Sequence, residues 1–448
     1  MKDRSNKVLF IFGLLTFAFS MMAIPIQAAN LSCQGSFQSQ MGVSLEDDHD
    51  LTRLETELVF QPEVVTADVQ FYGEIELRIP ASTGTVLTIS PPDMMVNEAY
   101  LDLYGFPHRQ VDLRLGKQLL PWGTGYQLNP TSNLNPEDFR SPFDFGRRLG
   151  VHGLTGKVYF ENLTVTAVGL PTFTPATLPE GHFQGLVSAL PDHALSLLPP
   201  GLTLTEDIRP IMPDNNWANA GTWGLKMEKN LFGWDFSLSY IHGRYTLPVA
   251  KRITIIPPPA DGTEPILQAE LTYPRRQVVG LDWAGAIGDY GLWGEAAFFF
   301  PEAVTTTIDA TALGFPAQEE TALEDTVYGK YLVGMDYGTD RVYLNLQYVY
   351  GFPQEMDHRN LGHYLVGGVE WTIKEDKLKF PFNFVWEIRD LDGKQPKTAH
   401  FIAPELRVYP DSNTELALIL RLIDGDTGTE LGKLKTWDEV EFKVKYSF

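Results

Sequence analysis

Apolar and polar residues alternate along many short stretches of this chain. Between residues 341 and 350, Val342 and Leu344 alternate with the polar side chains of Asn345 and Gln347. A period of two places successive side chains on opposite faces of an extended strand. The same alternation recurs at residues 69–78, 380–389, 415–422 and 440–448. The pattern therefore predicts an all-β chain.

Eighteen strand-like segments follow one another along the chain. We expect strands near residues 31–43, 51–60, 64–79, 95–104, 111–120, 150–160, 162–170, 217–229, 232–245, 269–286, 289–300, 326–338, 340–352, 361–374, 378–390, 397–409, 414–424 and 436–448. Barrels of bacterial outer membranes have an even number of strands, a condition that sixteen strands would also meet.

The connections between these segments alternate in length. Those after even strands are short, at Gln61-Pro62-Glu63, Glu161-Asn162, Asn230-Leu231, Gly288, Gly338-Thr339-Asp340 and Glu375-Asp376-Lys377. Those after odd strands are longer, at residues 80–94, 121–149, 171–216, 246–268 and 301–325. Short periplasmic turns and long external loops are typical of outer-membrane barrels. The sequence therefore predicts a transmembrane antiparallel β-barrel.

Composition narrows the possible partners and cofactors. After residue 28 no apolar run approaches the length of a membrane helix, so strands must do any spanning. The formal net charge of −22 argues against nucleic-acid binding. A single cysteine, Cys33, excludes both an internal disulfide and the Cys-x-x-Cys-His attachment of a haem. We expect no nucleic-acid partner and no cofactor.

The sequence carries no motif of an enzyme. It lacks Gly-x-Ser-x-Gly, His-Glu-x-x-His and the Walker phosphate loop, and its histidines are scattered. Acidic clusters at residues 46–50, 390–393 and 424–428 offer oxygen ligands for Ca²⁺, but none continues into a complete EF-hand loop. We expect no catalysis and no metal site, and regard these acids as solvated or as sharing ions with lipopolysaccharide.

Residues 1–28 combine a basic start with an apolar stretch and end at Ala28. This arrangement predicts a cleaved secretory signal, followed by one barrel domain at residues 29–448. An uncleaved anchor is the alternative for the apolar stretch. Lipidation at Cys33 fits poorly, because Asn30 stands where an aliphatic residue is needed.

The loop at residues 121–149 is expected to fold into the barrel. Its prolines exclude regular structure over much of its length. Its aromatic residues are too many for a solvated tip, and they are Trp122, Tyr126, Phe139, Phe143 and Phe145. It ends on Arg140, Arg147 and Arg148, opposite carboxylates of inward parity at Glu74, Glu76, Glu98, Asp102 and Asp112. These charges either select solutes through a transverse field or only neutralise one another and hold the loop.

A motif at this loop resembles a group of Gram-negative porin-like barrels that includes the alginate-export type. The motif consists of Arg114, Gly116, Lys117, Gln118, Trp122, Gly123, Asn129, Pro130, Asn135, Pro136 and Asp138. The resemblance implies that the loop narrows the lumen. The last strand, with Phe442, Val444, Tyr446 and Phe448 on one face, resembles the C-terminal assembly signal of outer-membrane barrels.

These features predict an outer-membrane channel for passive diffusion of small hydrophilic or charged solutes. Its partners would be membrane lipid, lipopolysaccharide, the barrel assembly machinery and the solute, and the sequence defines no oligomeric state. The alternative function is a barrel sheath around a protein partner, such as a multihaem cytochrome. A lumen narrowed by an inward loop leaves less room for such a partner.

Overall fold

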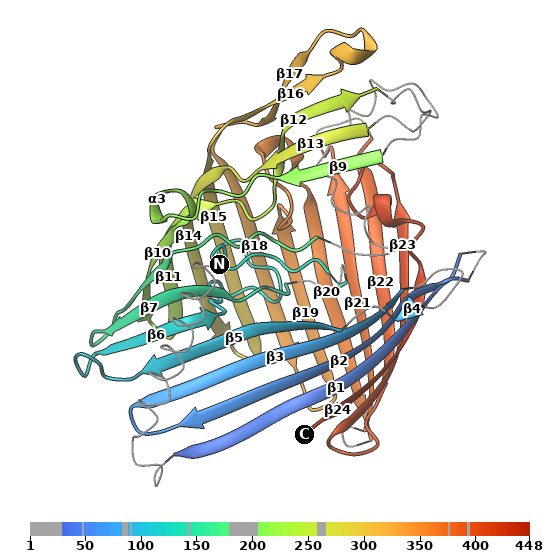
Figure 1. Cartoon of the computed structure of the whole chain (residues 1–448). Helices are drawn as coiled ribbons and strands as arrows, with labels where there is room; N and C mark the ends of the chain where they lie inside the picture. Colours follow the sequence, from blue (N-terminus) through green and yellow to red (C-terminus); the bar gives the residue numbers. More distant parts are fainter. Residues whose placement is uncertain are drawn as a thin grey trace, which may run out of the picture.

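The computed structural model describes residues 29–46, 49–82, 88–89, 92–140, 143–144, 146–178, 205–257, 266–374, 377–391 and 395–448. The signal sequence expected at residues 1–28 lies outside this part of the chain. In the described part, one large antiparallel sheet closes on itself into a barrel (Figure 1). The only α-helix there is the single turn α3 (Trp217–Ala220), and no described helix is long and apolar enough to cross a membrane.

The barrel wall has eighteen strands. The sheet contains nineteen, but β4 (Thr88–Ile89) pairs only with the end of β3 and adds nothing to the wall. The wall strands are β1 (Asn30–Ser44), β2 (Leu51–Val65), β3 (Val69–Ser82), β5 (Asp93–Leu103), β6 (Val111–Gln118), β7 (Val151–Tyr159), β8 (Thr164–Leu170), β10 (Thr222–Leu231), β11 (Trp234–Arg244), β14 (Arg275–Ile287), β15 (Tyr290–Pro301), β18 (Tyr328–Gly338), β19 (Val342–Tyr350), β20 (His363–Ile373), β21 (Leu378–Arg389), β22 (Lys397–Val408), β23 (Thr414–Gly425) and β24 (Glu439–Ser447). Each pairs with its neighbours in chain order, which confirms the predicted count and order.

The last strand closes the barrel against the first. β24 pairs with β1 from Ser36 opposite Ser447 to Ser44 opposite Glu439. The terminal residue continues this ladder, because Phe448 exchanges both backbone hydrogen bonds with Gly35, at 2.9 and 3.0 Å. Closure leaves the sheet without a free edge, so every strand pairs its backbone N–H and C=O groups with neighbours on both sides, as lipid surroundings require.

Two of the predicted turns are wrong by a few residues. β2 continues through Gln61-Pro62-Glu63, and the turn lies at residues 66–68. Pro62 is tolerated there because residues 61 and 62 have no partner in the β3 ladder. The turn assigned to Asn230-Leu231 lies instead at Phe232-Gly233, where both residues have positive φ, 56° and 82°, as two-residue hairpin turns require.

The outer surface of the barrel is apolar, with aromatic residues toward both ends. Leu344 and Leu346 are exposed on β19, whereas Asn345 and Gln347 point inward and are buried. One aromatic band includes Trp223, Phe298, Tyr331, Tyr348 and Trp386, and the other includes Phe160, Phe232, Tyr290, Trp371, Tyr446 and Phe448. Such girdles flank the lipid-facing band of outer-membrane barrels.

Three of the long connections form a second sheet beyond one rim of the barrel (Figure 1). Its strands, in spatial order, are β17 (Gln318–Leu323), β16 (Val304–Asp309), β12 (Val249–Ile256), β13 (Ile266–Thr272) and β9 (Thr205–Pro210). Ile253, Leu267 and Ile308 are buried on one of its faces. The long connections expected at residues 171–216, 246–268 and 301–325 thus contain strands of their own, and the strand expected at 269–286 is divided between β13 of this sheet and β14 of the wall.

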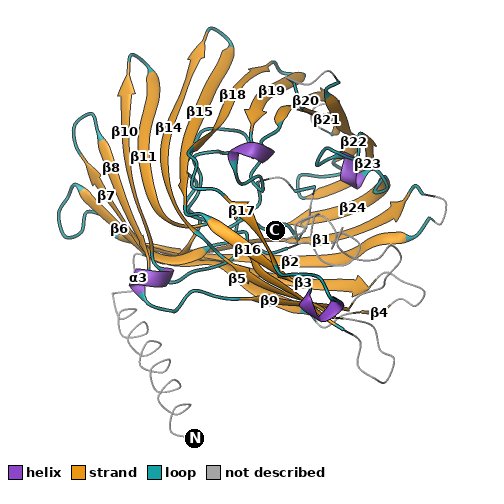
Figure 2. Ribbon diagram, turned by 90° about the horizontal axis from the view of Figure 1, so that it is seen from above, coloured by secondary structure: helices purple, strands orange, loops and turns teal. Residues whose placement is uncertain are grey.

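The inner wall is not polar throughout. Val385, Phe401 and Ile423 point inward from β21, β22 and β23 and are buried. Leu128 of the loop after β6 and Leu431, next to η5 (Gly432–Leu434), belong to the same cluster. Chain segments that fold into the lumen therefore bury an apolar part of the wall. Figure 2, seen from above, shows these connections inside the ring of strands.

Candidate pore constriction

Of the segment between β6 and β7, the described residues 119–140, 143–144 and 146–150 lie inside the barrel and are fixed to the wall at two places. The first is Glu295 on β15. Its carboxylate accepts the backbone N–H groups of Thr124 and Gly125, both at 2.6 Å, and that of Thr131 at 3.0 Å. The hydroxyl of Thr131 adds a fourth hydrogen bond at 2.9 Å. This stretch adds no strand to the barrel ladder, so a wall carboxylate satisfies N–H groups that would otherwise be buried unpaired.

Gln347 on β19 extends the same attachment. Its amide accepts from the backbone N–H of Tyr126 at 2.8 Å and donates to the backbone carbonyl of Tyr126 at 2.9 Å. The indole of Trp293 also donates to the Gln347 oxygen, at 3.1 Å, which holds the amide in one orientation. Residues 124–131 are thus held against β15 and β19.

The second attachment joins the far end of the segment to β3. Asp138 is completely buried and accepts from Arg140, Arg147 and the hydroxyl of Thr177. Arg147 also donates to Glu76 of β3 at 2.5 Å. Burial alone would raise the pKa of Asp138, but the hydrogen bonds and charges of Arg140, Thr177 and Arg147 hold it well below its usual range. The group stays ionised and keeps both guanidinium groups in place.

The two attachments lie on distant parts of the wall, because β3 and β15 are separated by several strands in the barrel order. Between them, Phe143 stacks on Phe401 of β22 with ring centroids 5.7 Å apart. The segment therefore crosses the lumen and divides it.

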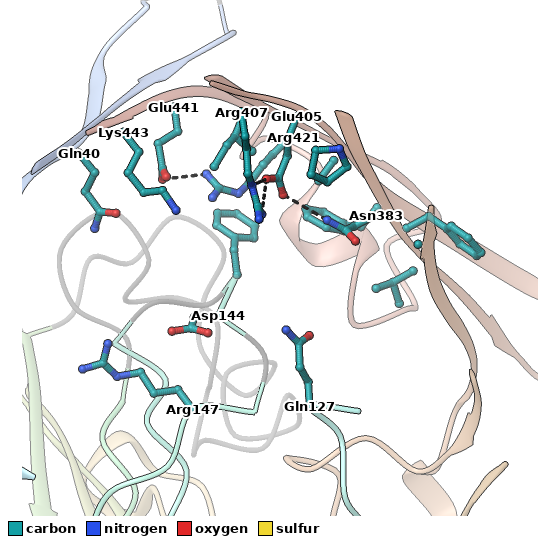
Figure 3. Close-up of a pocket in the computed structure, with 18 of the residues that line it drawn as sticks. Gln40, Gln127, Asp144, Arg147, Asn383, Glu405, Arg407, Arg421, Glu441 and Lys443 are labelled. Atoms are coloured by element: carbon teal, nitrogen blue, oxygen red, sulfur yellow. Dashed lines mark hydrogen bonds and ion pairs between the residues drawn. The ribbon is translucent and has the colours of Figure 1, made fainter. Parts of the chain in front are cut away.

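A cavity of about 390 Å³ remains between this segment and the wall. The segment contributes Gln127, Asp144 and Arg147 to its lining. The wall contributes, among others, Gln40, Arg53, Asn383, Glu405, Arg407, Arg421, Glu441 and Lys443. Figure 3 shows Gln127, Asp144 and Arg147 of the segment on one side of the open space, and the labelled wall residues, among them Arg407, Arg421 and Lys443, on the other.

In three ion pairs at this cavity, the guanidinium group is more exposed than the carboxylate that it binds. The side chain of Arg407 is 28% exposed and that of Glu405 is 8% exposed. Arg147 is likewise 28% exposed, against 0% for Asp138. Arg421 follows the same rule, at 10% against 0% for Glu439. In these three pairs the guanidinium group therefore presents more of its surface to the cavity than the carboxylate does, although Glu405 and Glu441 also line the cavity.

Asp144 is a carboxylate of the segment itself. It is exposed on the segment and faces the cavity (Figure 3), and no hydrogen bond or ion pair of its carboxylate occurs among the described residues. Loss of water around it raises its pKa, an effect that Asp138 adds to and that Arg147, Lys443 and Arg53 oppose.

The other residues singled out from the sequence have structural partners. Trp122 and Gln118 are buried, and the side chain of Asn135 bonds to the backbone of Gln118, Leu120 and Leu149. Arg148 pairs with Glu137 and does not line the cavity. On the wall, Glu74 accepts from Gln61 and Asn97, Glu98 accepts from the N–H of Leu119, Asp112 accepts from the N–H of Gly105, and Asp102 pairs with Arg114. In the segment, Tyr126 lines the cavity. The backbone carbonyl of Asn129 accepts from the N–H of Ser132, whereas its side-chain oxygen is buried and has no hydrogen-bond partner among the described residues.

The structure brings Glu76, Arg140 and Arg147 together, whereas Arg148 pairs with Glu137. Sequence reasoning did not single out Glu295 or Arg407. Glu295 had a signal, since it is the single acid in an apolar stretch of β15. Phe145, Asp47, Asp48 and Asp392 lie outside the described residues, and the rest of the described chain contains no cluster of three potential metal ligands.

The closed barrel with an inward segment is the architecture of outer-membrane porins. Residues 91–448 match the model of a family described as "Protein of unknown function (DUF1302)", so the chain belongs to this family. No curated protein matches the sequence. The fold is similar to that of Pseudomonas aeruginosa OccK2 (OpdF) in complex with glucuronate, with a TM-score of 0.50, 11% identity, and 94% of this chain and 98% of that chain covered. Acinetobacter baumannii OccAB4 is similar too, with a TM-score of 0.50, 9% identity, and coverage of 95% and 99%.

Proposed function

We propose that this protein is an outer-membrane channel for passive diffusion of small hydrophilic solutes, and that its passage favours solutes carrying a negative charge. The observation that carries the proposal is that in three ion pairs at the cavity, those of Arg147, Arg407 and Arg421, the guanidinium group is more exposed than the carboxylate that it binds. Fixed charges at close range to a narrow path select permeating ions by sign. The lipid-facing surface and its aromatic girdles support a location in the outer membrane, reached by signal-directed export and by the barrel assembly machinery.

A sheath around a protein partner is not favoured. Such a sheath needs an open lumen, whereas the segment after β6, together with the connections that carry Phe352 and Leu431, occupies the inside of this barrel. The remaining cavity of about 390 Å³ suits a small molecule and is far smaller than a folded domain.

The test is a measurement on the purified barrel in planar bilayers. Under a potassium chloride gradient the reversal potential should show a preference for chloride over potassium. Glucuronate is a suitable organic anion, since the similar OccK2 structure is described in complex with it. Glucuronate should permeate liposomes that contain the barrel faster than glucosamine, a cationic sugar of similar size. A barrel that conducts no ions, or that prefers potassium and glucosamine, would contradict the proposal.

A further inference from the structure

Glu295 holds the segment that narrows the passage, but it does not itself line the cavity. Its carboxylate is 4% exposed and receives four hydrogen bonds from residues 124–131. Tyr126 and Gln127, which follow Gly125 in the chain, line the cavity. The position of Tyr126 and Gln127 at the edge of the passage therefore depends on the Glu295 carboxylate, which does not line the passage itself.

The sequence of the segment fits this role. A Cβ atom at Gly123 would lie 2.6 Å from a Glu295 oxygen, and the residue has a φ of +103°. Glycine is needed here because it alone permits both the close approach and this backbone conformation without strain. Thr131 supplies a backbone N–H and a hydroxyl to the same oxygen. The residue types at Gly123 and Thr131 are thus both suited to contact with the Glu295 carboxylate.

The opposite end of the segment is held independently. Asp138, Arg140 and Arg147 attach it to Glu76 on β3. Without Glu295, residues 124–131 would lose four hydrogen bonds to the wall and keep those to Gln347 and Trp283, while the attachment of Arg140 and Arg147 to Glu76 would remain. The passage would then change in width and steadiness without any change in the charged groups that line it.

We propose that Glu295 is the positioning residue that sets the width of the passage. The proposal rests on the channel function proposed above. It separates two properties of the channel: Glu295 governs size and steadiness, and the basic side chains govern charge preference.

The test compares Glu295→Gln with Glu387→Gln. Both changes are isosteric, and Glu387 on β21 also accepts backbone N–H groups of an inward segment, from Glu430 and Leu431, away from the cavity. In single-channel recordings, Glu295→Gln should lose the single steady conductance level, and the largest polyethylene glycol that enters should shift upward in size. The reversal potential should not change. Glu387→Gln should behave as the wild type.

A second variant acts from the segment. Thr131→Val keeps the side-chain shape and removes only the hydroxyl donor to Glu295, so it should show the same effect in weaker form; it also carries the test if Glu295→Gln does not assemble. The proposal is overturned if these variants have wild-type conductance, noise and size limit, or if Glu387→Gln reproduces their effect. Proteolysis of the folded barrel gives a readout independent of conduction: cleavage within residues 121–135 should increase in Glu295→Gln. A wild-type barrel that does not conduct would refute the channel function, whereas unchanged cleavage would refute the attachment.

Discussion

Arg147 and Arg148 are adjacent in sequence and face different environments. Arg147 reaches Glu76 and Asp138 and borders the cavity. Arg148 bonds to Glu137, whose other oxygen accepts from Thr246. The sequence showed two equivalent arginines, since no local pattern distinguishes them in an irregular segment. Only their partners, which come from distant strands and loops, separate a passage residue from a structural one.

We expect Arg147→Ala to reduce the preference for anions, because an exposed cation is lost while the carboxylates of Glu76 and Asp138 remain. Arg148→Ala is the matched control and should leave the reversal potential unchanged. Both are measured in planar bilayers under a salt gradient. An equal shift in the two variants would show that the overall charge of the loop matters and that its position does not.

Asp144 should make ion preference depend on pH. Its pKa is raised, so it takes up a proton at a higher pH than an ordinary aspartate. On protonation the cations facing it, Arg147, Lys443 and Arg53, lose an opposing charge, and anion preference should increase as the pH falls. Asp144→Asn should show the higher preference already at neutral pH and a smaller change on acidification. Wild-type-like titration in this variant would assign the change to another group.

At the scale of elements, the alternation of side chains with period two was sufficient to locate the wall strands. Every wall strand has one face toward lipid and one toward the lumen, so each shows this alternation. It was insufficient for β12, β13 and β16, whose pattern is the same but whose sheet lies beyond the rim. The attachment of the inward segment was also out of reach, since Glu295 meets Thr124 across 171 residues of chain. The alternation shows that a residue such as Glu295 faces the lumen, but it does not show which residue Glu295 contacts there.

One of the two Asn-Pro steps of the segment, that of Asn135, holds the segment together. The side chain of Asn135 joins the two ends of the segment, bonding to the N–H of Leu120 and to the carbonyls of Gln118 and Leu149. Asn135→Ala would leave these buried groups unpaired, at about 1–3 kcal/mol for each. We expect faster proteolysis of residues 121–149 in the folded barrel. Asn133→Ala, which removes one bond to Pro130, is the control and should have a smaller effect.

At the scale of the whole molecule, the barrel was predictable because its two ends must meet. Phe448 exchanges both backbone hydrogen bonds with Gly35, and its ring lies 6.1 Å from that of Phe60 and 6.5 Å from that of Tyr446. A Cβ atom at Gly35 would lie 2.7 Å from the Phe448 ring, so glycine makes room for the terminal aromatic residue. The residues expected to form the assembly signal therefore belong to the seam that closes the barrel.

We expect Phe448→Asp to impair assembly, because it disrupts the last pair of the closing seam. The loss of lipid contact alone is too small an effect, since a charge near the membrane interface costs only about 0–1 kcal/mol. Phe232→Asp is the control: Phe232 is fully exposed in the turn between β10 and β11, away from the seam. Outer-membrane abundance and heat-modifiable mobility on gels should fall in Phe448→Asp and be retained in Phe232→Asp. Equal losses would indicate a general intolerance of charge at this end of the barrel, and normal abundance of Phe448→Asp would show that closure does not need the terminal ring.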